Sequence, residues 1–131
     1  MELSKYSRNR IYETFVRWDV PKDFADPMYN YLVHGFPPGS CFTAILANDF
    51  TTAIRSSHPV NTVEALKALS GWIQDTVPLR ARGNYDLVNL WCMMSDSDRR
   101  ALLEELRLVY TEKEELVLIL KDERTVEPHL W

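Results

Sequence analysis

Residues 31–39 read YLVHGFPPG, and this stretch decides how the chain folds. Apolar residues precede Gly35, a residue type that readily takes the left-handed conformation in which many helices end. Pro37 and Pro38 cannot continue that helix, and the apolar sequence after Gly39 predicts that another begins at once. The stretch therefore predicts a sharp junction that fixes two helices at a defined angle.

Two helices are predicted up to this junction. Ser7 is a candidate N-cap for the first, which extends to about Trp18 with its apolar residues on one face. Asp26 followed by Pro27 has the pattern of an N-cap and first helical turn, so the second helix is predicted to begin there. Gly35 is the predicted end of this second helix.

Two further helices and an apolar segment follow the junction. A third helix is predicted over residues 40–56, because apolar residues recur at spacings of three and four and form one buried stripe that includes Phe50 and Ile54. Pro59 prevents its continuation, and Asn61 is predicted to cap a fourth helix that ends before Pro78. The very apolar segment 85–94 predicts a central helix with little solvent-exposed face.

The last third of the chain predicts a helix, followed by a segment that is either helical or partly extended. Ser95 or Ser97 is a candidate cap for the helix. Thr111 and Glu114 have the spacing of a capping box, which predicts another helix start. The apolar run LVLIL lies within 116–131 and fits either a buried helix or a strand, so this segment is predicted to be helical or partly extended.

Length and composition indicate one globular domain over residues 1–131. The chain can bury a core without metal or disulfide support, and 46% of its residues are hydrophobic. It has no signal-peptide pattern and no apolar run long enough for a membrane span. Cys41 and Cys92 lie among apolar neighbours, which favours reduced, buried thiols in a cytoplasmic protein. We therefore expect a soluble, single all-α domain of six or seven short helices, away from membranes.

The net charge of −4 is concentrated in one region. Residues 1–94 contain nine acidic and nine basic residues, whereas residues 95–131 contain ten acidic and six basic residues. This balance argues against direct binding to duplex nucleic acid. The acidic region is either an ordinary solvated face or a surface that engages a basic partner site, and its candidate contacts are Glu104, Glu105, Glu114 and Glu115.

Asp49 interrupts the predicted apolar stripe of the third helix. A carboxylate among Phe42, Ile45 and Ala53 is costly unless it is paired or hydrogen-bonded. One interpretation makes Asp49 structural, accepting bonds from backbone N–H groups or pairing with a cation such as His34. A second makes it a perturbed acid or base in a cleft with His34 or His58, and a third makes it a partly exposed residue without a special role. We predict structural roles for the polar residues His34, Asp49 and Asn61.

No cofactor, metal site or catalytic set of residues is predicted. His34, Cys41, Asp49 and His58 are single residues without the close, repeated spacing that zinc ligands usually show. Arginine side chains could bind a phosphate or carboxylate, although an ordinary solvated loop is the favoured interpretation for Arg80 and Arg82. The candidate ligand-binding arginines are Arg55, Arg80 and Arg82.

The sequence around the junction resembles a family of small phage and prophage proteins. In that family a Tyr-Leu-Val-x-Gly-x-Pro-x-Gly segment leads into an apolar helix ending near Asn-Asp-Leu, where this chain has Asn48-Asp49-Phe50. Asn61, Trp72-Ile73 and Pro78 match further positions, so the resemblance covers residues 15–92. The chain departs from the pattern by carrying Arg-Gly-Asn at 82–84 in place of Trp-Gly-Ser, and Ser-Ser-His-Pro at 56–59 in place of Ala-Asp. The resemblance implies a phage context in a bacterial cell and transfers no catalytic residue.

Three functions follow as hypotheses. The first is a phage-type interaction protein that binds and inhibits a host or bacterial-immunity component, such as a CRISPR–Cas effector, through residues 80–84 and 96–127. The second is a homo-oligomer that holds a small anionic ligand, such as a signalling nucleotide, between protomers with its arginines. The third is an enzyme that uses Asp49 with a histidine.

Overall fold

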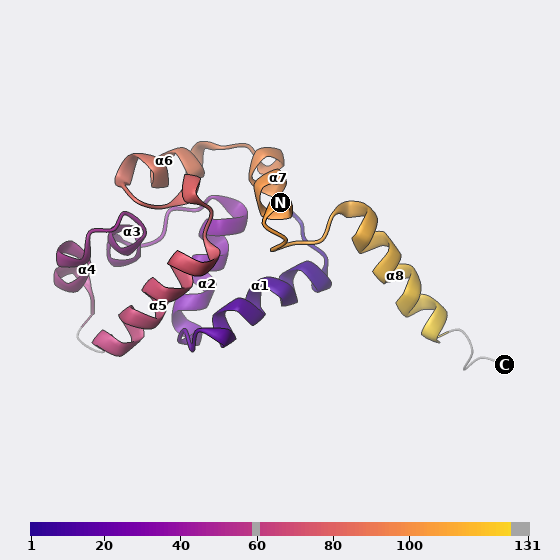
Figure 1. Cartoon of the computed structure of the whole chain (residues 1–131), viewed down its shortest axis with the longest axis horizontal. Helices are drawn as coiled ribbons and strands as arrows, with labels where there is room; N and C mark the ends of the chain where they lie inside the picture. Colours follow the sequence, from indigo (N-terminus) through magenta and orange to yellow (C-terminus); the bar gives the residue numbers. More distant parts are fainter. Residues whose placement is uncertain (59–60, 127–131) are drawn as a thin grey trace.

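The computed structural model describes residues 1–58 and 61–126, and within these ranges the chain forms eight α-helices, one short 3₁₀-helix and no strand (Figure 1). The all-α, single-domain prediction is confirmed, but the number of helices is larger than the six or seven predicted. The elements in chain order are α1 (Lys5–Arg17), α2 (Lys22–His34), α3 (Ser40–Leu46), α4 (Phe50–Ser56), α5 (Val63–Thr76), η1 (Leu79–Ala81), α6 (Tyr85–Met93), α7 (Asp96–Glu105) and α8 (Glu112–Val126).

The additional helix arises because the predicted helix over residues 40–56 is broken. Asn48 has a positive φ of 62°, and Asp49 caps the start of α4 by accepting a hydrogen bond from the backbone N–H of Thr52. Asn tolerates the left-handed conformation and Asp is among the best N-cap residues, so this pair stops α3 and starts α4. The prediction of one continuous helix was wrong at this point.

The junction at residues 35–39 has the predicted form. Gly35 ends α2 in the left-handed conformation with φ 69°, and Gly39 precedes α3 as its N-cap. The guanidinium of Arg99, which is almost completely buried, donates hydrogen bonds to the carbonyl oxygens of Val33 and His34. Carbonyls at a helix end lack partners within the helix, so Arg99 fastens the end of α2 to α7.

Several helix starts differ from the predictions. Ser4 rather than Ser7 caps α1, and Ser7 is buried in the first turns of that helix. The helix α2 begins four residues before Asp26, so Pro27 lies inside it rather than in its first turn. Thr62 caps α5 in place of the neighbouring Asn61. The predicted cap at Ser95 and the capping box of Thr111 and Glu114 are confirmed.

The core is built around α2, which lies between α6 and the pair α1 and α5 (Figure 1). The indole N–H of Trp91 donates to the carbonyl oxygen of Tyr31 at 3.0 Å, and the Tyr31 hydroxyl donates to that of Ala81 at 2.6 Å. Buried aromatic residues supply much apolar surface, and here their polar atoms are also hydrogen-bonded. These bonds tie α2 to α6 and η1.

The helix α6 is a surface helix, contrary to the predicted central position. Among its apolar residues only Val88 and Trp91 are buried, whereas Tyr85, Leu90 and Met93 are exposed. Its apolar composition predicted burial on all sides, because sequence alone does not show whether a second layer of protein covers a helix.

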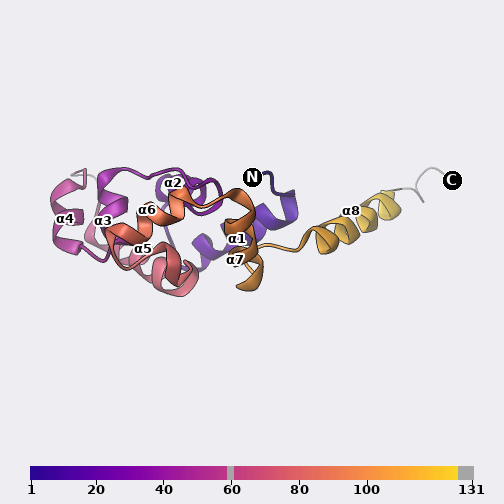
Figure 2. The ribbon, with the colours of Figure 1, turned by 90° about the horizontal axis from the view of Figure 1, so that it is seen from above.

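The helix α8 extends away from the other helices, as two perpendicular views show (Figures 1 and 2). The apolar run at 116–120 is helical, so the strand alternative was wrong for 116–126, and residues 127–131 lie outside the described part of the chain. Across the described residues, none of the helices has the length and apolar character needed to cross a membrane.

Candidate interaction surfaces

Asp49 is a helix cap on the surface rather than a buried carboxylate. One of its oxygens accepts from the Thr52 amide at 3.2 Å, and the other accepts from the hydroxyl of Tyr85 at 2.7 Å. The bonds from Tyr85 and Thr52 hold the pKa of Asp49 below its usual range. Asp49 therefore fixes the start of α4 and links it to the first residue of α6.

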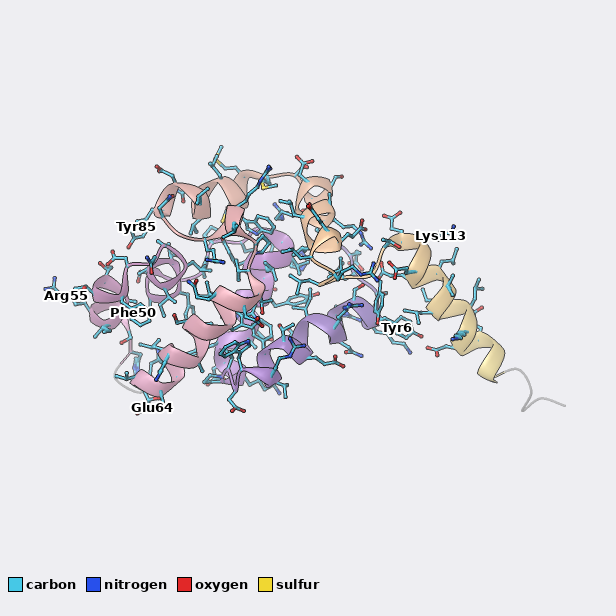
Figure 3. All side chains as sticks on the ribbon, viewed as in Figure 1. Tyr6, Phe50, Arg55, Glu64, Tyr85 and Lys113 are labelled. Atoms are coloured by element: carbon cyan, nitrogen blue, oxygen red, sulfur yellow. The ribbon has the colours of Figure 1, made fainter. Side chains whose placement is uncertain are left out.

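We predict that the substitution Tyr85→Phe raises the pKa of Asp49 toward its usual range, because it removes the hydroxyl that stabilises the ionised carboxylate. The pKa is measured by NMR titration of the side-chain carboxyl carbon. The control is Tyr6→Phe, since Tyr6 lies at the α8 side of the molecule (Figure 3) and its loss should leave that pKa unchanged. An unchanged Asp49 pKa in Tyr85→Phe would contradict the assignment.

His34 lies at the end of α2, in surroundings different from those of Asp49. Its Nδ1 atom is 3.4 Å from the amino group of Met1, and its ring packs against those of Tyr29 and Phe36. Burial, together with the Met1 amino group, lowers the pKa of His34. The partners of His34 and of Asp49 are thus different residues, and the geometry lends no support to an acid–base pair between them.

Asn61 lies in the turn before α5. Its backbone N–H donates to the carbonyl oxygen of His58 at 2.8 Å, while the neighbouring Thr62 caps the helix. Asn61 therefore stabilises the turn that precedes α5 and does not cap the helix.

The three candidate arginines have different surroundings. The Arg82 guanidinium donates to the carbonyl oxygens of Val77 and Gln74 and to the side-chain oxygen of Gln74, so it closes the C-terminal end of α5. Arg55 on α4 and Arg80 in η1 are exposed. Because Arg82 is already engaged within the chain, the structure does not display the three guanidinium groups as one anion site.

Most of the candidate acidic contacts are engaged within the molecule. Glu115 is only 7% exposed and accepts from the Ser4 amide, the Ser7 hydroxyl and the Arg100 guanidinium. Burial raises the pKa of Glu115, but the bonds from Ser4, Arg100 and Ser7 outweigh it and lower the pKa overall. This carboxylate holds α8 against the body and is not presented to a partner.

Glu114 and Glu104 also have partners in the chain. The Arg107 guanidinium and the capping contacts with Thr111 lower the pKa of Glu114 to about 2. Glu104 accepts from Arg100 at 2.9 Å, whereas Glu105 is exposed. Of the four candidate acids, Glu105 is the one that the structure leaves most open to solvent.

One cleft lies between α1, the end of α5 and residues 106–118. It has a volume of about 750 Å³ and is lined by three arginines, Arg10, Arg17 and Arg107, together with acidic and aromatic residues. Arg10 stacks over the ring of Tyr110, Arg17 lies 4.0 Å from Asp75, and Arg107 pairs with Glu114. Each of these three arginines therefore already has a partner within the chain.

Exposed apolar side chains gather on α4 and α6, at the end of the molecule opposite α8 (Figure 3). Phe50 and Ile54 were predicted to be buried, yet Ile54 is 55% exposed and Phe50 is also accessible. The break at Asn48 and Asp49 reorients α4 relative to α3, which turns these residues outward. We define the α4–α6 end as Phe50, Ile54, Arg55 and Tyr85.

A second exposed apolar set lies on α8. Leu116 is 56% exposed, and Val117, Ile119 and Leu120 are exposed as well. Single exposed apolar residues are common on soluble proteins, but adjacent ones mark interaction sites. The sequence signal for this set is the LVLIL run itself, although periodicity did not show that it would be uncovered.

Metal-ligating side chains do not cluster in the described ranges 1–58 and 61–126: no group of three or more His, Cys, Asp or Glu residues could hold an ion. Neither a protein-family model nor a curated protein nor a solved structure matches the chain. The geometry of the chain's own residues therefore carries the functional interpretation that follows.

Proposed function

We propose that this chain is a small, non-enzymatic binding protein of the phage or prophage type that attaches to a host or bacterial-immunity protein, such as a CRISPR–Cas component, and inhibits it. The observation that carries the proposal is the α4–α6 end, where exposed aromatic and aliphatic side chains lie beside exposed Arg55. The centres of protein interfaces are enriched in aromatic residues and Arg, and this end displays Phe50, Tyr85 and Arg55.

The α4–α6 end offers a rigid platform for such a contact. Phe50 and Ile54 lie one turn apart on the same face of α4, so both can enter one apolar pocket of a partner. The bond between Asp49 and Tyr85 joins α4 to α6, which keeps the two exposed faces in a fixed relation. A preformed surface loses less conformational entropy on binding than a flexible one.

The partner that fits this end has an apolar pocket with a carboxylate at its edge. Arg55 follows Ile54 directly and is exposed, so it can pair with an acidic group of the partner while the apolar residues are buried. Burying a side chain such as Ile or Phe contributes about 1.5–3 kcal/mol. We therefore expect affinity to come from Phe50 and Ile54, and orientation from Arg55.

A contact made mainly by acidic residues fits the structure less well. Glu115, Glu114 and Glu104 are hydrogen-bonded to arginines of the same chain, so reversing their charges would damage the fold before it tested a partner. Within the acidic region, exposed Glu105 is the suitable position for testing charge mimicry.

The proposal is tested by native mass spectrometry on tagged protein isolated from phage-infected bacterial cells. We predict a stoichiometric complex with one bacterial or phage protein for the wild type, and its loss by more than about tenfold in Ile54→Asp. The matched control is Val16→Asp, because Val16 is strongly exposed on α1, outside the α4–α6 end. Equal capture by the two variants, or no complex with the wild type, would refute the proposal.

A further inference from the structure

One face of the helix α8 contacts the body of the molecule, and the other is exposed. The residues of each face follow from the helical spacing. The face toward the body contains Glu115, half-buried Leu118 and Asp122, whose carboxylate lies 3.5 Å from the ammonium group of Lys5. At about 100° per residue, the side of α8 turned away from these residues includes positions 113, 116, 120 and 123. We call Lys113, Leu116, Leu120 and Glu123 the α8 ridge.

Nothing in the described chain covers this ridge. All four residues are exposed, and α8 extends away from the other helices in both views (Figures 1 and 2). A helix of this length is only marginally stable in water by itself, and exposed adjacent leucines lose favourable burial. The spacing of three, four and three residues is that of the contact positions in a two-helix coiled coil.

We propose that the α8 ridge packs antiparallel against the α8 ridge of a second copy of this chain. The two-fold axis crosses between the two helices at the height of residue 118, midway along the ridge. In this arrangement, residues that face each other lie equally far before and after position 118 in their own helices. Leu116 therefore faces Leu120 of the second copy. Lys113 then faces Glu123 of the second copy, and symmetry repeats both pairs. The ridge is thus self-complementary, with an apolar centre and opposite charges at its two ends.

In a parallel pairing the α8 ridge would not be complementary to itself. In that orientation Lys113 would face Lys113 and Glu123 would face Glu123, which places like charges together at both ends. The attachment of the body also favours the antiparallel arrangement. Each body joins α8 at its first residue, so the two bodies lie at opposite ends of the helix pair and do not compete for space (Figure 1).

This inference goes beyond the proposed function and does not depend on it. In the dimer, the two α4–α6 ends lie at the far sides of the assembly, because α4 and α8 occupy opposite ends of each chain (Figures 1 and 3). Such a dimer could engage two partner molecules at once, or two sites of one oligomeric partner, which raises the effective affinity.

Sedimentation equilibrium of the full chain over a concentration series tests the pairing. The wild type should shift from the 15.3 kDa monomer toward twice that mass as its concentration rises. Leu116→Asp should raise the dimer dissociation constant by more than about tenfold. Leu90→Asp is the matched control, because Leu90 is 54% exposed on α6, close to the 56% of Leu116, and it should leave dimerisation unchanged.

Charge exchange tests the antiparallel orientation. Lys113→Glu should weaken the dimer by placing two carboxylates opposite each other, and Glu123→Lys should do the same with two ammonium groups. The double variant Lys113→Glu/Glu123→Lys should restore dimerisation to near the wild-type level. A chain that stays monomeric at every concentration overturns the inference. So does a double variant that is as weak as the single ones, or a Leu90→Asp variant as weak as Leu116→Asp.

Discussion

Replacing Gly35 with alanine should lower the free energy of unfolding by about 3 kcal/mol. The φ of 69° at this position is strained for alanine, and the added Cβ would lie 2.6 Å from Nη1 of Arg99. Arg99 cannot move aside without giving up its bonds to the carbonyl oxygens of Val33 and His34. The substitution thus combines backbone strain with the loss of buried hydrogen bonds.

Gly39→Ala is the matched control in the same junction. Its φ of −60° suits alanine, and a Cβ there meets no atom within 4 Å. This variant should change the free energy of unfolding by less than about 1 kcal/mol, because alanine restricts the unfolded chain but is a poorer N-cap than glycine. Urea denaturation followed by circular dichroism measures both. Equal stabilities of the two variants would show that Gly35 has no special role.

The second large effect is expected from Glu115→Ala, with a loss of about 3 kcal/mol. Its carboxylate accepts from Ser4, Ser7 and Arg100, so the substitution leaves several donors without their partner. Because these bonds hold α8 to α1 and α7, we expect α8 to detach before the rest of the fold is lost. Hydrogen exchange of the α8 amides, together with urea denaturation, measures the two effects.

Glu105→Ala serves as the comparison for this second variant. Glu105 is exposed at the end of α7, and exposed positions without special contacts usually change stability by less than about 0.5 kcal/mol. If the two alanine variants proved equally stable and equally protected from exchange, the anchoring role of Glu115 would be wrong.

Much of the fold was predictable from residues whose conformation is restricted. Gly35, followed closely by two prolines, specified where α2 ends and where α3 begins, because few other backbone paths are open to these residues. The cap at Ser95 and the capping box from Thr111 to Glu114 were also specified locally.

The break between α3 and α4 shows the limit of such prediction. Apolar spacing continued across residues 40–56, but local bonding by Asn48 and Asp49 outweighed it. The same error hid the exposed faces of Phe50 and Ile54, because a continuous helix would have placed them in the core. Periodicity reports which residues share a face and does not report whether that face is covered.

The α8 ridge was unpredictable for a related reason. The run LVLIL is apolar on every side of a helix, so its composition predicted burial within the chain. Its position depends instead on Glu115, which joins α8 to α7 through Arg100 and to the start of α1 through contacts more than 100 residues apart in sequence. Contacts at that separation depend on the assembled fold and cannot be read from local patterns.

The most direct test of the proposed function is photo-crosslinking from the α4–α6 end inside infected bacterial cells. A photoreactive amino acid is placed at position 54, and in a second variant at position 67, since Lys67 is exposed on α5. We predict that position 54 gives one discrete adduct with a bacterial or phage protein, identified by mass spectrometry, and that position 67 does not. No adduct at position 54, or the same adducts from both positions, would contradict the proposal that this end binds a partner.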